Sequence, residues 1–460
     1  MRRITVLACG LAAVAVFVVG SIVASSQTRG GNAAVIYEGG RLLIGDQSAP
    51  IENGAFVVQN GRITAVGRKG AVNAPANAAH VDLTGKTVMP GLINVHVHIG
   101  YEGYTSWGAE DYTPANIVDH LQRELFYGVV ATQTVGSSPT DASIQFIADQ
   151  DAGTFPPASR FLFMPGMAPP NGGPDATLKK GTDATHAVYE VSTGGDARAA
   201  VQGMAAKGLK NVKIWVDDRR GTYPKMTPEV YNAVVDEAHK HGMLVHAHAI
   251  ALPDQKAVVG AGVDVLVHTV QNEKLDDEFL ALLRQHKPYW TSVIGLGDRS
   301  EVCNNDPFID QSYPGNVLAQ IRQTRCGPVG ANNANREAIM ANNVPLMVKN
   351  GARLVLGTDA GINPTYSFGW ADHHEMWRWV ESGLTPAEAI VAATSRAAAL
   401  LGLKDLGAIA AGKSADFVVL NANPLDDIKN TRTIASVYLR GNKVDRDALA
   451  AGFKKGDTSQ

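Results

Sequence analysis

The chain has 460 residues, which exceeds one ordinary domain but suits a barrel of about 250 residues with a smaller companion domain. Its hydrophobic content of 45% and charged content of 18% are typical of a soluble globular protein. The formal net charge of −3 provides neither the basic surface that a nucleic-acid partner requires nor an acidic tail.

The first segment has the pattern of an export signal. Arg2 and Arg3 precede an uncharged, mostly apolar run, residues 4–24, and small polar residues follow it. We expect residues 1–26 to be a signal peptide cleaved near Ser26, which makes the protein exported, either periplasmic or secreted. A run of roughly 20 residues is also long enough to remain as an uncleaved membrane anchor, and this alternative stays open.

Short alternating strands separated by turns occur at both ends of the remaining chain. Near the start, the alternation is broken by Asn60-Gly61, a hairpin signal. Near the end, the same kind of pattern returns over residues 416–444. Each end is too short to bury a sheet face alone. We therefore predict that residues 33–90 and 403–445 form one small β-sandwich domain, which the central part of the chain interrupts.

Strands and helices alternate through the central part, residues 91–402. Helical patterns separate most of the strands, and Thr385 with Glu388 forms the capping-box pattern that begins one helix. Eight strands separated by helices predict an α/β fold of the (β/α)8 TIM-barrel type. The expected strands are residues 92–98, 129–134, 161–164, 212–216, 244–247, 265–268, 289–293 and 354–358.

Residues that can bind a metal lie on five of these strands or directly after them. Chemistry in such a barrel collects at the carboxyl ends of the strands. The candidates are His96 and His98 on the first strand, Lys213 on the fourth, His248 after the fifth, His268 on the sixth and Asp359 after the eighth. Residues two apart on a strand point to one side, so both imidazoles of the first pair project towards one point. Each candidate alone has an ordinary structural explanation, but six in barrel order favour a metal centre.

With these residues the chain resembles the metal-dependent amidohydrolase superfamily, in its imidazolonepropionase-like and prolidase-like branch. The similar stretches are residues 88–98, 242–248, 262–268, 356–361 and 382–393. The interrupted β-sandwich is also that family's arrangement, so the resemblance extends over nearly all of the chain after the signal.

Two positions depart from the family's pattern, and on one strand two histidines compete as the metal ligand. Asn94 stands where the family usually has aspartate, and Thr269 stands where the nearer relatives often carry glycine. Neither change removes a ligand. On the fifth strand the family spacing favours His248 as the ligand, and His246, one pleat deeper, is the second choice.

The resemblance implies a binuclear metal-dependent amidohydrolase. One divalent ion would take His96, His98 and Asp359, the other would take His248 and His268, and Lys213 would bridge them as a carbamate. Two cations close together need such an anionic bridge. Zinc is the first expectation because nitrogen and oxygen donors suit it, with manganese, cobalt and iron left open. A metal-bridging hydroxide would attack a carbonyl carbon, with Asp359 as general base and then general acid.

The expected substrates are small molecules with an amide bond, namely dipeptides or N-acyl amino acids. Cyclic amides, lactones or phosphotriesters at the same site are the alternative, and a non-catalytic metal-binding protein is a remote one. Substrate-binding candidates in the loops after the strands are Tyr104, Arg219, Arg220 and Tyr223. The last three could hold a substrate carboxylate by charge-assisted hydrogen bonds. A homo-oligomer stays open.

Two cysteines, Cys303 and Cys326, remain once the signal is removed. They bracket residues 304–325, a polar stretch with two prolines that reads as a loop insertion. Cysteines of an exported protein pair in an oxidising compartment. We therefore predict a disulfide between them, with two free buried thiols as the alternative.

Overall fold

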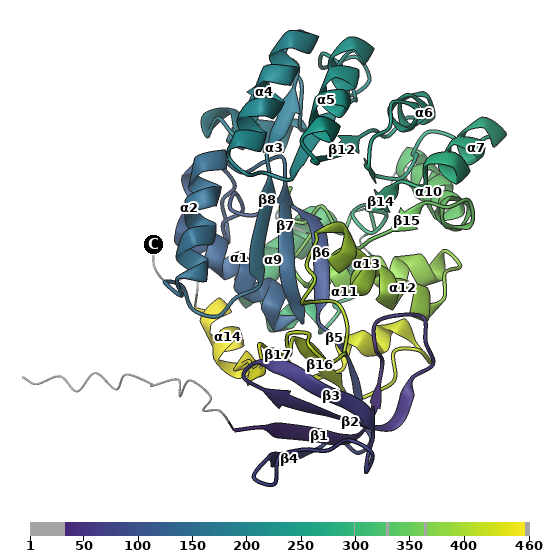
Figure 1. The fold of residues 1–460 in the computed structure, drawn as a ribbon. Coiled ribbons are helices and arrows are strands. Elements are labelled where there is room, and N and C mark those ends of the chain that lie inside the picture. Colours follow the sequence, from purple (N-terminus) through teal and green to yellow (C-terminus); the bar gives the residue numbers. More distant parts are fainter. Residues whose placement is uncertain (1–32, 299, 328–330, 363–365, 456–460) are drawn as a thin grey trace, which may run out of the picture.

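The computed structural model describes residues 33–298, 300–327, 331–362 and 366–455. The expected signal segment, residues 1–26, lies outside these described residues. Figure 1 shows a large body in which strands and helices alternate, and a sheet at its lower end that is built from both ends of the described chain. No helix in the four described ranges is long and apolar enough to cross a membrane.

The large body is a TIM barrel built around two runs of parallel strands. One run has the order β6-β7-β8 and the other has the order β10-β9-β11-β12-β13-β14-β15. The strands are β6 (Leu92–Val97), β7 (Val129–Val135), β8 (Arg160–Met164), β9 (Gly166–Ala168), β10 (Val188–Glu190), β11 (Asn211–Trp215), β12 (Leu244–His248), β13 (Val265–Val267), β14 (Tyr289–Thr291) and β15 (Arg353–Leu354).

Backbone contacts join the two runs at both ends. Only Pro165 separates β8 from β9, and its carbonyl oxygen accepts a hydrogen bond from Lys213 N at 2.9 Å. Between β6 and residues 356–360, Val95 N donates to Leu356 O and His98 N donates to Ala360 O, both at 2.8 Å, and Thr358 N and Asp359 N both donate to His96 O. The strands therefore follow one another in barrel order, although their ladders do not form an unbroken ring within the described residues. The eighth strand is shorter than the expected range because residues 356–360 make only isolated contacts with β6, such as the bridge between Val97 and Ala360.

Helices cover the barrel strands, and their ends follow the capping rules. Thr385 and Glu388 make the expected capping box, because each side chain accepts a backbone hydrogen bond from the other residue. The helices are α1 (Pro114–Phe126), α2 (Thr140–Asp151), α3 (Ala176–Ala184), α4 (Gly194–Ala206), α5 (Pro228–Lys240), α6 (Leu252–Gly260), α7 (Asp277–His286), α8 (Ser300–Cys303), α9 (Gly315–Arg325), α10 (Ala331–Lys349), α11 (Trp370–Glu381), α12 (Pro386–Ala393), α13 (Ser395–Leu400) and α14 (Arg446–Phe453), with short 3-10 turns at Ala109–Asp111, Ile309–Gln311 and Ile428–Arg432.

The sheet at the lower end joins both ends of the described chain. Its order is β18-β17-β16-β5-β1-β2-β3, with β4 also paired to β1. Its strands are β1 (Val35–Leu42), β2 (Ile51–Gln59), β3 (Arg62–Arg68), β4 (Ala79–Asp82), β5 (Thr87–Pro90), β16 (Phe417–Leu420), β17 (Ile434–Leu439) and β18 (Asn442–Lys443). Only Gly91 separates β5 from β6, so this sheet leads directly into the first barrel strand.

This sheet is curled, where the sequence predicted a sandwich of strands. The rings of Phe56 on β2 and Phe417 on β16 lie 5.0 Å apart, although β1 and β5 stand between their strands. In a flat sheet they would be separated by three strand spacings of about 4.8 Å each. The sheet therefore bends over an aromatic core, which Tyr37 and Tyr438 complete. One curled sheet thus encloses a core between its own two halves, as the two sheets of a sandwich would.

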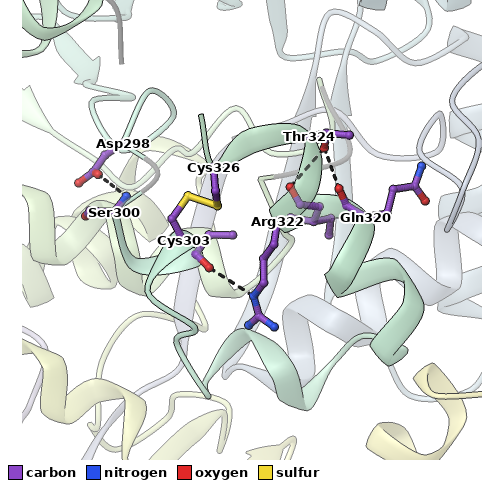
Figure 2. Close-up of a disulfide and its surroundings, with 9 residues drawn as sticks. Asp298, Ser300, Cys303, Gln320, Arg322, Thr324 and Cys326 are labelled. Atoms are coloured by element: carbon purple, nitrogen blue, oxygen red, sulfur yellow. Dashed lines mark hydrogen bonds between the residues drawn. A yellow bond between two sulfur atoms is a disulfide. The ribbon is translucent and has the colours of Figure 1, made fainter. Parts of the chain in front are cut away.

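A disulfide closes the excursion that the chain makes between β14 and α10. Cys303 at the end of α8 and Cys326 after α9 are joined, with an S–S distance of 2.11 Å (Figure 2). Arg322 of α9 reaches back between them and donates from Nε to the carbonyl oxygen of Val302 at 3.4 Å. The covalent bond and this contact hold α8 against α9.

Two carboxyl groups are buried together behind the first barrel strand. Glu124 of α1 and Asp372 of α11 are fully buried and contact each other, and Asp372 also contacts Asn94 of β6. None of their four oxygens has a hydrogen bond of good geometry, although Asn94 and the backbone of Gly369 lie close, and a proton shared between the two groups would satisfy the pair. Burial raises the pKa of Asp372 to about 8, and burial with the neighbouring carboxyl raises the pKa of Glu124 well above its usual value.

Loss of the disulfide should destabilise the protein. Replacing Cys303 and Cys326 by serine removes a cross-link between residues 23 apart, and the unfolded chain then regains entropy equivalent to about 3 kcal/mol of stability. Urea unfolding with and without reductant measures this effect. Reductant should lower the free energy of unfolding of the wild type by the same amount as the double substitution does. It should leave the free energy of unfolding of the double variant unchanged. A wild type indifferent to reductant would contradict the prediction.

The buried acid pair should make stability fall as pH rises. Because the folded state holds a proton that the unfolded carboxyls release near pH 4, the stabilisation is complete below pH 4 and is lost as pH rises towards 8. The free energy of unfolding should fall by up to about 1.4 kcal/mol per pH unit for one proton. Urea unfolding between pH 4.5 and 8 should show a flatter profile for Asp372→Asn. The control Asp277→Asn, at an exposed position of α7, should keep the wild-type slope.

Candidate metal centre

The first barrel strand is tied to the eighth by the side chain of Asn94. Its Oδ1 accepts a hydrogen bond from His96 N at 3.0 Å, and its Nδ2 donates to Thr358 Oγ1 at 3.0 Å. An amide can accept and donate at once, whereas the aspartate usual in the family offers only acceptors when ionised. The asparagine also avoids a third carboxyl beside the buried acid pair.

His96, His98 and Asp359 form a compact cluster at the end of these strands. One ligand atom from each lies within 4.8 Å of the others. His98 Nε2 is 2.8 Å from Asp359 Oδ1. His96 Nε2 is 3.1 Å from the same oxygen but lacks hydrogen-bond geometry, so it is a buried nitrogen without a hydrogen-bond partner.

This cluster fits a divalent metal ion. The other ring nitrogens are held, because His98 Nδ1 lies 2.8 Å from Ser137 Oγ and His96 Nδ1 lies 3.5 Å from Thr291 Oγ1. Such outer contacts orient the Nε2 atoms for metal binding. Burial lowers the pKa of His96 to about 3, which keeps its imidazole neutral, the form that ligates a metal.

The other three predicted ligands line the same cavity from neighbouring strands. Lys213 lies on β11, His248 ends β12 and His268 follows β13. The rings of His248 and His268 have centroids 4.4 Å apart, and the ring of His268 is 5.8 Å from that of His96. Lys213 is 1% exposed, and this burial lowers its pKa to about 7, so a large part of its amine is uncharged near neutral pH.

His248 is engaged by two side chains from the loop after β11. Its Nε2 lies 2.9 Å from Asp217 Oδ2 and 2.5 Å from Arg219 Nη1. Arg219 also forms an ion pair with Asp217. The lone pair of His248 Nε2 cannot serve both a guanidinium and a metal, so Arg219 must withdraw before that nitrogen becomes a ligand. Asp217 follows an apolar strand as Asp359 does, and that pattern marks it in the sequence.

His246 lies away from this centre. Its side chain is 1% exposed, and its Nε2 is 3.3 Å from Asn211 Oδ1, near the start of β11. It is absent from the residues that line the cavity. In this structure the second-choice ligand is a core histidine, and His248 is the histidine of β12 that reaches the cavity.

Four residues that line the cavity have left-handed backbone conformations, namely Arg219 in the loop after β11, with a φ value of 50°, and three residues that follow strand ends. His268, Val293 and Asp359 follow barrel strands with φ values of 76°, 54° and 65°. This region disfavours side chains with a Cβ, most of all the β-branched valine. Strain of this kind concentrates where a site requires a particular side-chain direction. It turns the chain at the strand ends so that His268 and Asp359 face the cavity.

The cavity has a volume of about 350 Å³ and combines the six predicted ligands with an apolar wall. Leu178, Trp215, Ile250, Val293 and Met340 contribute to that wall. The structure places the four substrate-binding candidates differently. Arg219 lines the cavity, Arg220 is exposed, Tyr223 is half-buried outside the lining, and Tyr104 donates to Asp119 Oδ1 at 3.2 Å beside a separate small hollow.

Arg336 of α10 is a cavity residue that no sequence pattern marks. It lies inside a polar helical stretch, far from any strand end. Only the packing of α10 against the barrel mouth brings its guanidinium to the cavity.

Comparison with known proteins agrees with the observed fold. The Amidohydrolase family model matches residues 87–444. Ochratoxinase from Aspergillus niger is 24% identical over 444 residues, covering 86% of this chain and 82% of its own. Imidazolonepropionase from Deinococcus radiodurans is 38% identical over 100 residues, which is 21% of this chain and 24% of its own.

A solved structure extends this likeness to three dimensions. The putative prolidase from Bifidobacterium longum is 27% identical with a TM-score of 0.69, covering 92% of this chain and 99% of its own. The expected resemblance is therefore confirmed: the chain belongs to the amidohydrolase family, in its imidazolonepropionase-like and prolidase-like branch, and is a hydrolase that acts on amide bonds.

Proposed function

We propose that this protein is an exported, binuclear metal-dependent hydrolase that cleaves dipeptides or N-acyl amino acids. The observation that carries the proposal is the cluster of His96, His98 and Asp359 in a cavity of about 350 Å³. That volume lies at the small end of the range for small-molecule pockets, about 300–1,000 Å³, and so favours short substrates over polypeptides. The likeness to ochratoxinase and to a putative prolidase supports an amide linked to an amino acid.

Export and domain division belong to the same proposal. A disulfide such as Cys303–Cys326 persists in oxidising compartments, which supports a periplasmic or secreted location after removal of residues 1–26. An anchored form is the alternative. We assign residues 33–90 with 403–445 to the sheet domain and residues 91–402 to the catalytic barrel.

The residues that would hold the metal are the six that line the cavity. His96, His98 and Asp359 would bind one divalent ion, and His248 and His268 the other, with zinc as our first choice. Lys213 would lie between them as a carbamate, and its buried position among the ligands supports that role. When bound, such ions acidify a water molecule and polarise a carbonyl group.

The protein side chains perform the proton transfer. Asp359 Oδ1, held by His98 Nε2, would accept the proton of the attacking water and return it to the leaving amine nitrogen. Arg219 would move from His248 when the centre is loaded. The apolar wall excludes water around the substrate and strengthens the electrostatic interactions inside the cavity.

Asp359 should be required for turnover but not for binding a first metal. We expect the metal-loaded wild type to hydrolyse dipeptides, including Xaa-Pro and Xaa-Arg, or N-acyl amino acids. Asp359→Asn removes the proton acceptor and should lower kcat about 10²–10⁴-fold, while His96 and His98 still bind metal. Chromatographic assay of the products, with elemental analysis of each protein, measures both effects.

The assay panel includes cyclic amides, lactones and phosphotriesters. Asp277→Asn, the exposed control, should keep the wild-type rate. Wild-type turnover confined to lactones or phosphotriesters would overturn the substrate proposal, and an Asp359→Asn protein with a near-wild-type rate would overturn the role of this carboxylate.

Lys213 should be required for the second metal ion. Lys213→Ala removes the anionic bridge, so we expect two ions per chain to fall to one or fewer and the rate to fall at least about 100-fold. Carbon-13 NMR after growth with labelled bicarbonate should show a carbamate signal in the wild type that the variant lacks.

Lys210→Ala is the matched control, because Lys210 is an exposed lysine only three residues upstream. It should retain the metal content, the signal and the rate of the wild type. A single ion per chain in the wild type, together with a fully active Lys213→Ala, would contradict the bridged centre.

A further inference from the structure

Arg336 differs from the other cationic side chains of the cavity. It lines the cavity from α10, its side chain is half-buried, and its Nε is buried without a hydrogen-bond partner. Within the described ranges the structure shows no ion pair or hydrogen bond for its guanidinium. An arginine that is partly desolvated without an anion loses hydration energy that no protein group restores.

The neighbouring charges are already engaged. Arg219 is paired with Asp217 and contacts His248. Asp175 accepts a hydrogen bond from Leu178 N at the start of α3. Lys213 is buried among the predicted ligands. Lys213 is assigned to the proposed metal centre, so among the described cavity cations outside that centre Arg336 is the one that forms no ion pair with a protein anion.

The surroundings of Arg336 place its guanidinium on a wall shared with the β14 loop. A Cβ built at Gly297 would lie 3.0 Å from Glu337 Oε1 and 3.5 Å from Arg336 Nη2, so both side chains pack against the backbone of that loop. Among the described residues the structure shows no ion pair between these two neighbours. Gly297 and Leu296 line the cavity from one end of the excursion that Cys303–Cys326 closes, and Arg336 and Met340 line it from the other. This wall combines apolar surface with one unpaired cation.

We propose that Arg336 is a specificity-determining residue that binds the carboxylate of the substrate. This inference rests on the proposed function and deepens it. A guanidinium matches a carboxylate with two parallel hydrogen bonds. The cavity is small, so an amide at the metal cluster and an anion at Arg336 must belong to one short molecule. An amino acid acylated on nitrogen, with an apolar side chain against the neighbouring wall, has that arrangement.

Two variants separate the charge of Arg336 from its bulk. Arg336→Met keeps a long unbranched side chain and removes the positive charge. Arg336→Lys keeps the positive charge but lacks the planar guanidinium with its two parallel donors. Lys349→Met is the matched control, since it removes one positive charge from an exposed position on the same helix. The probes are N-acetylphenylalanine and N-(2-phenylethyl)acetamide, which share the amide and the phenyl ring and differ only in the carboxylate.

Arg336→Met should raise KM for N-acetylphenylalanine about 10–100-fold, the effect of losing a hydrogen bond to a charged group. Its kcat should change little, and its kcat/KM for N-(2-phenylethyl)acetamide should stay within about threefold of the wild type. Arg336→Lys should recover part of the loss, and Lys349→Met should behave as the wild type. An equal loss on both probes, or no loss on either, would overturn the inference.

Calorimetry measures the affinity of both probes for the wild type and for Arg336→Met, and so tests the role of Arg336 independently of turnover. A wild type that hydrolyses no amide would overturn the proposed function alone. A wild-type preference for the carboxylate probe that disappears in Arg336→Met would still support the role of Arg336. Equal affinity of the wild type for both probes would overturn it.

Discussion

The meeting of the first and eighth barrel strands is the constraint on which the site depends. His98 and Asp359 are 261 residues apart in the chain, yet their side chains lie 2.8 Å apart. Asn94 makes this contact possible, because it accepts from His96 N and donates to Thr358 on the opposite strand. The buried acid pair behind Asn94 belongs to the same junction. Any shift of β6 against residues 356–360 would separate the imidazoles from the carboxylate.

The site holds its ligands in conformations that are unfavourable in isolation. A nearly inaccessible Lys213 and three left-handed residues at strand ends lie around one cavity. Barrel strands such as β6 and β7, which are buried along their whole length, resist relaxation, because moving one would open gaps in a close-packed interior. The sheet built from both chain ends contributes to this rigidity, since β5 leads into β6 through Gly91 and a Cβ at Gly91 would lie 2.4 Å from Val130 Cγ1.

The two sides of the cavity have different origins. The metal cluster lies on the ends of barrel strands, where backbone hydrogen bonds set the positions. The opposite wall, which includes Arg336, comes from the segment after β14 and from α10. Few strand contacts hold this segment in place, and the Cys303–Cys326 bond fixes α8 against α9. The oxidising compartment that the signal segment predicts would thus also be the one in which this wall is stabilised covalently. In the function that we propose, the chemistry and the specificity would therefore reside on separate elements that face each other.

The sequence by itself determined where the eight expected barrel strands lie, the order of the six cavity residues and the choice of the two cysteines, because these depend on local patterns. It did not predict the short strands β9 and β10 or the early end of the eighth strand. Residues two apart on a strand share a face, and polar residues after apolar strands mark the barrel mouth. The tertiary structure alone decided the rest. The contact of Arg219 with His248, the curl of the mixed sheet, the remote position of Tyr104 and the approach of Arg336 all join segments far apart in the chain. Such contacts follow from the packing of whole elements against each other, which no local spacing of residues encodes.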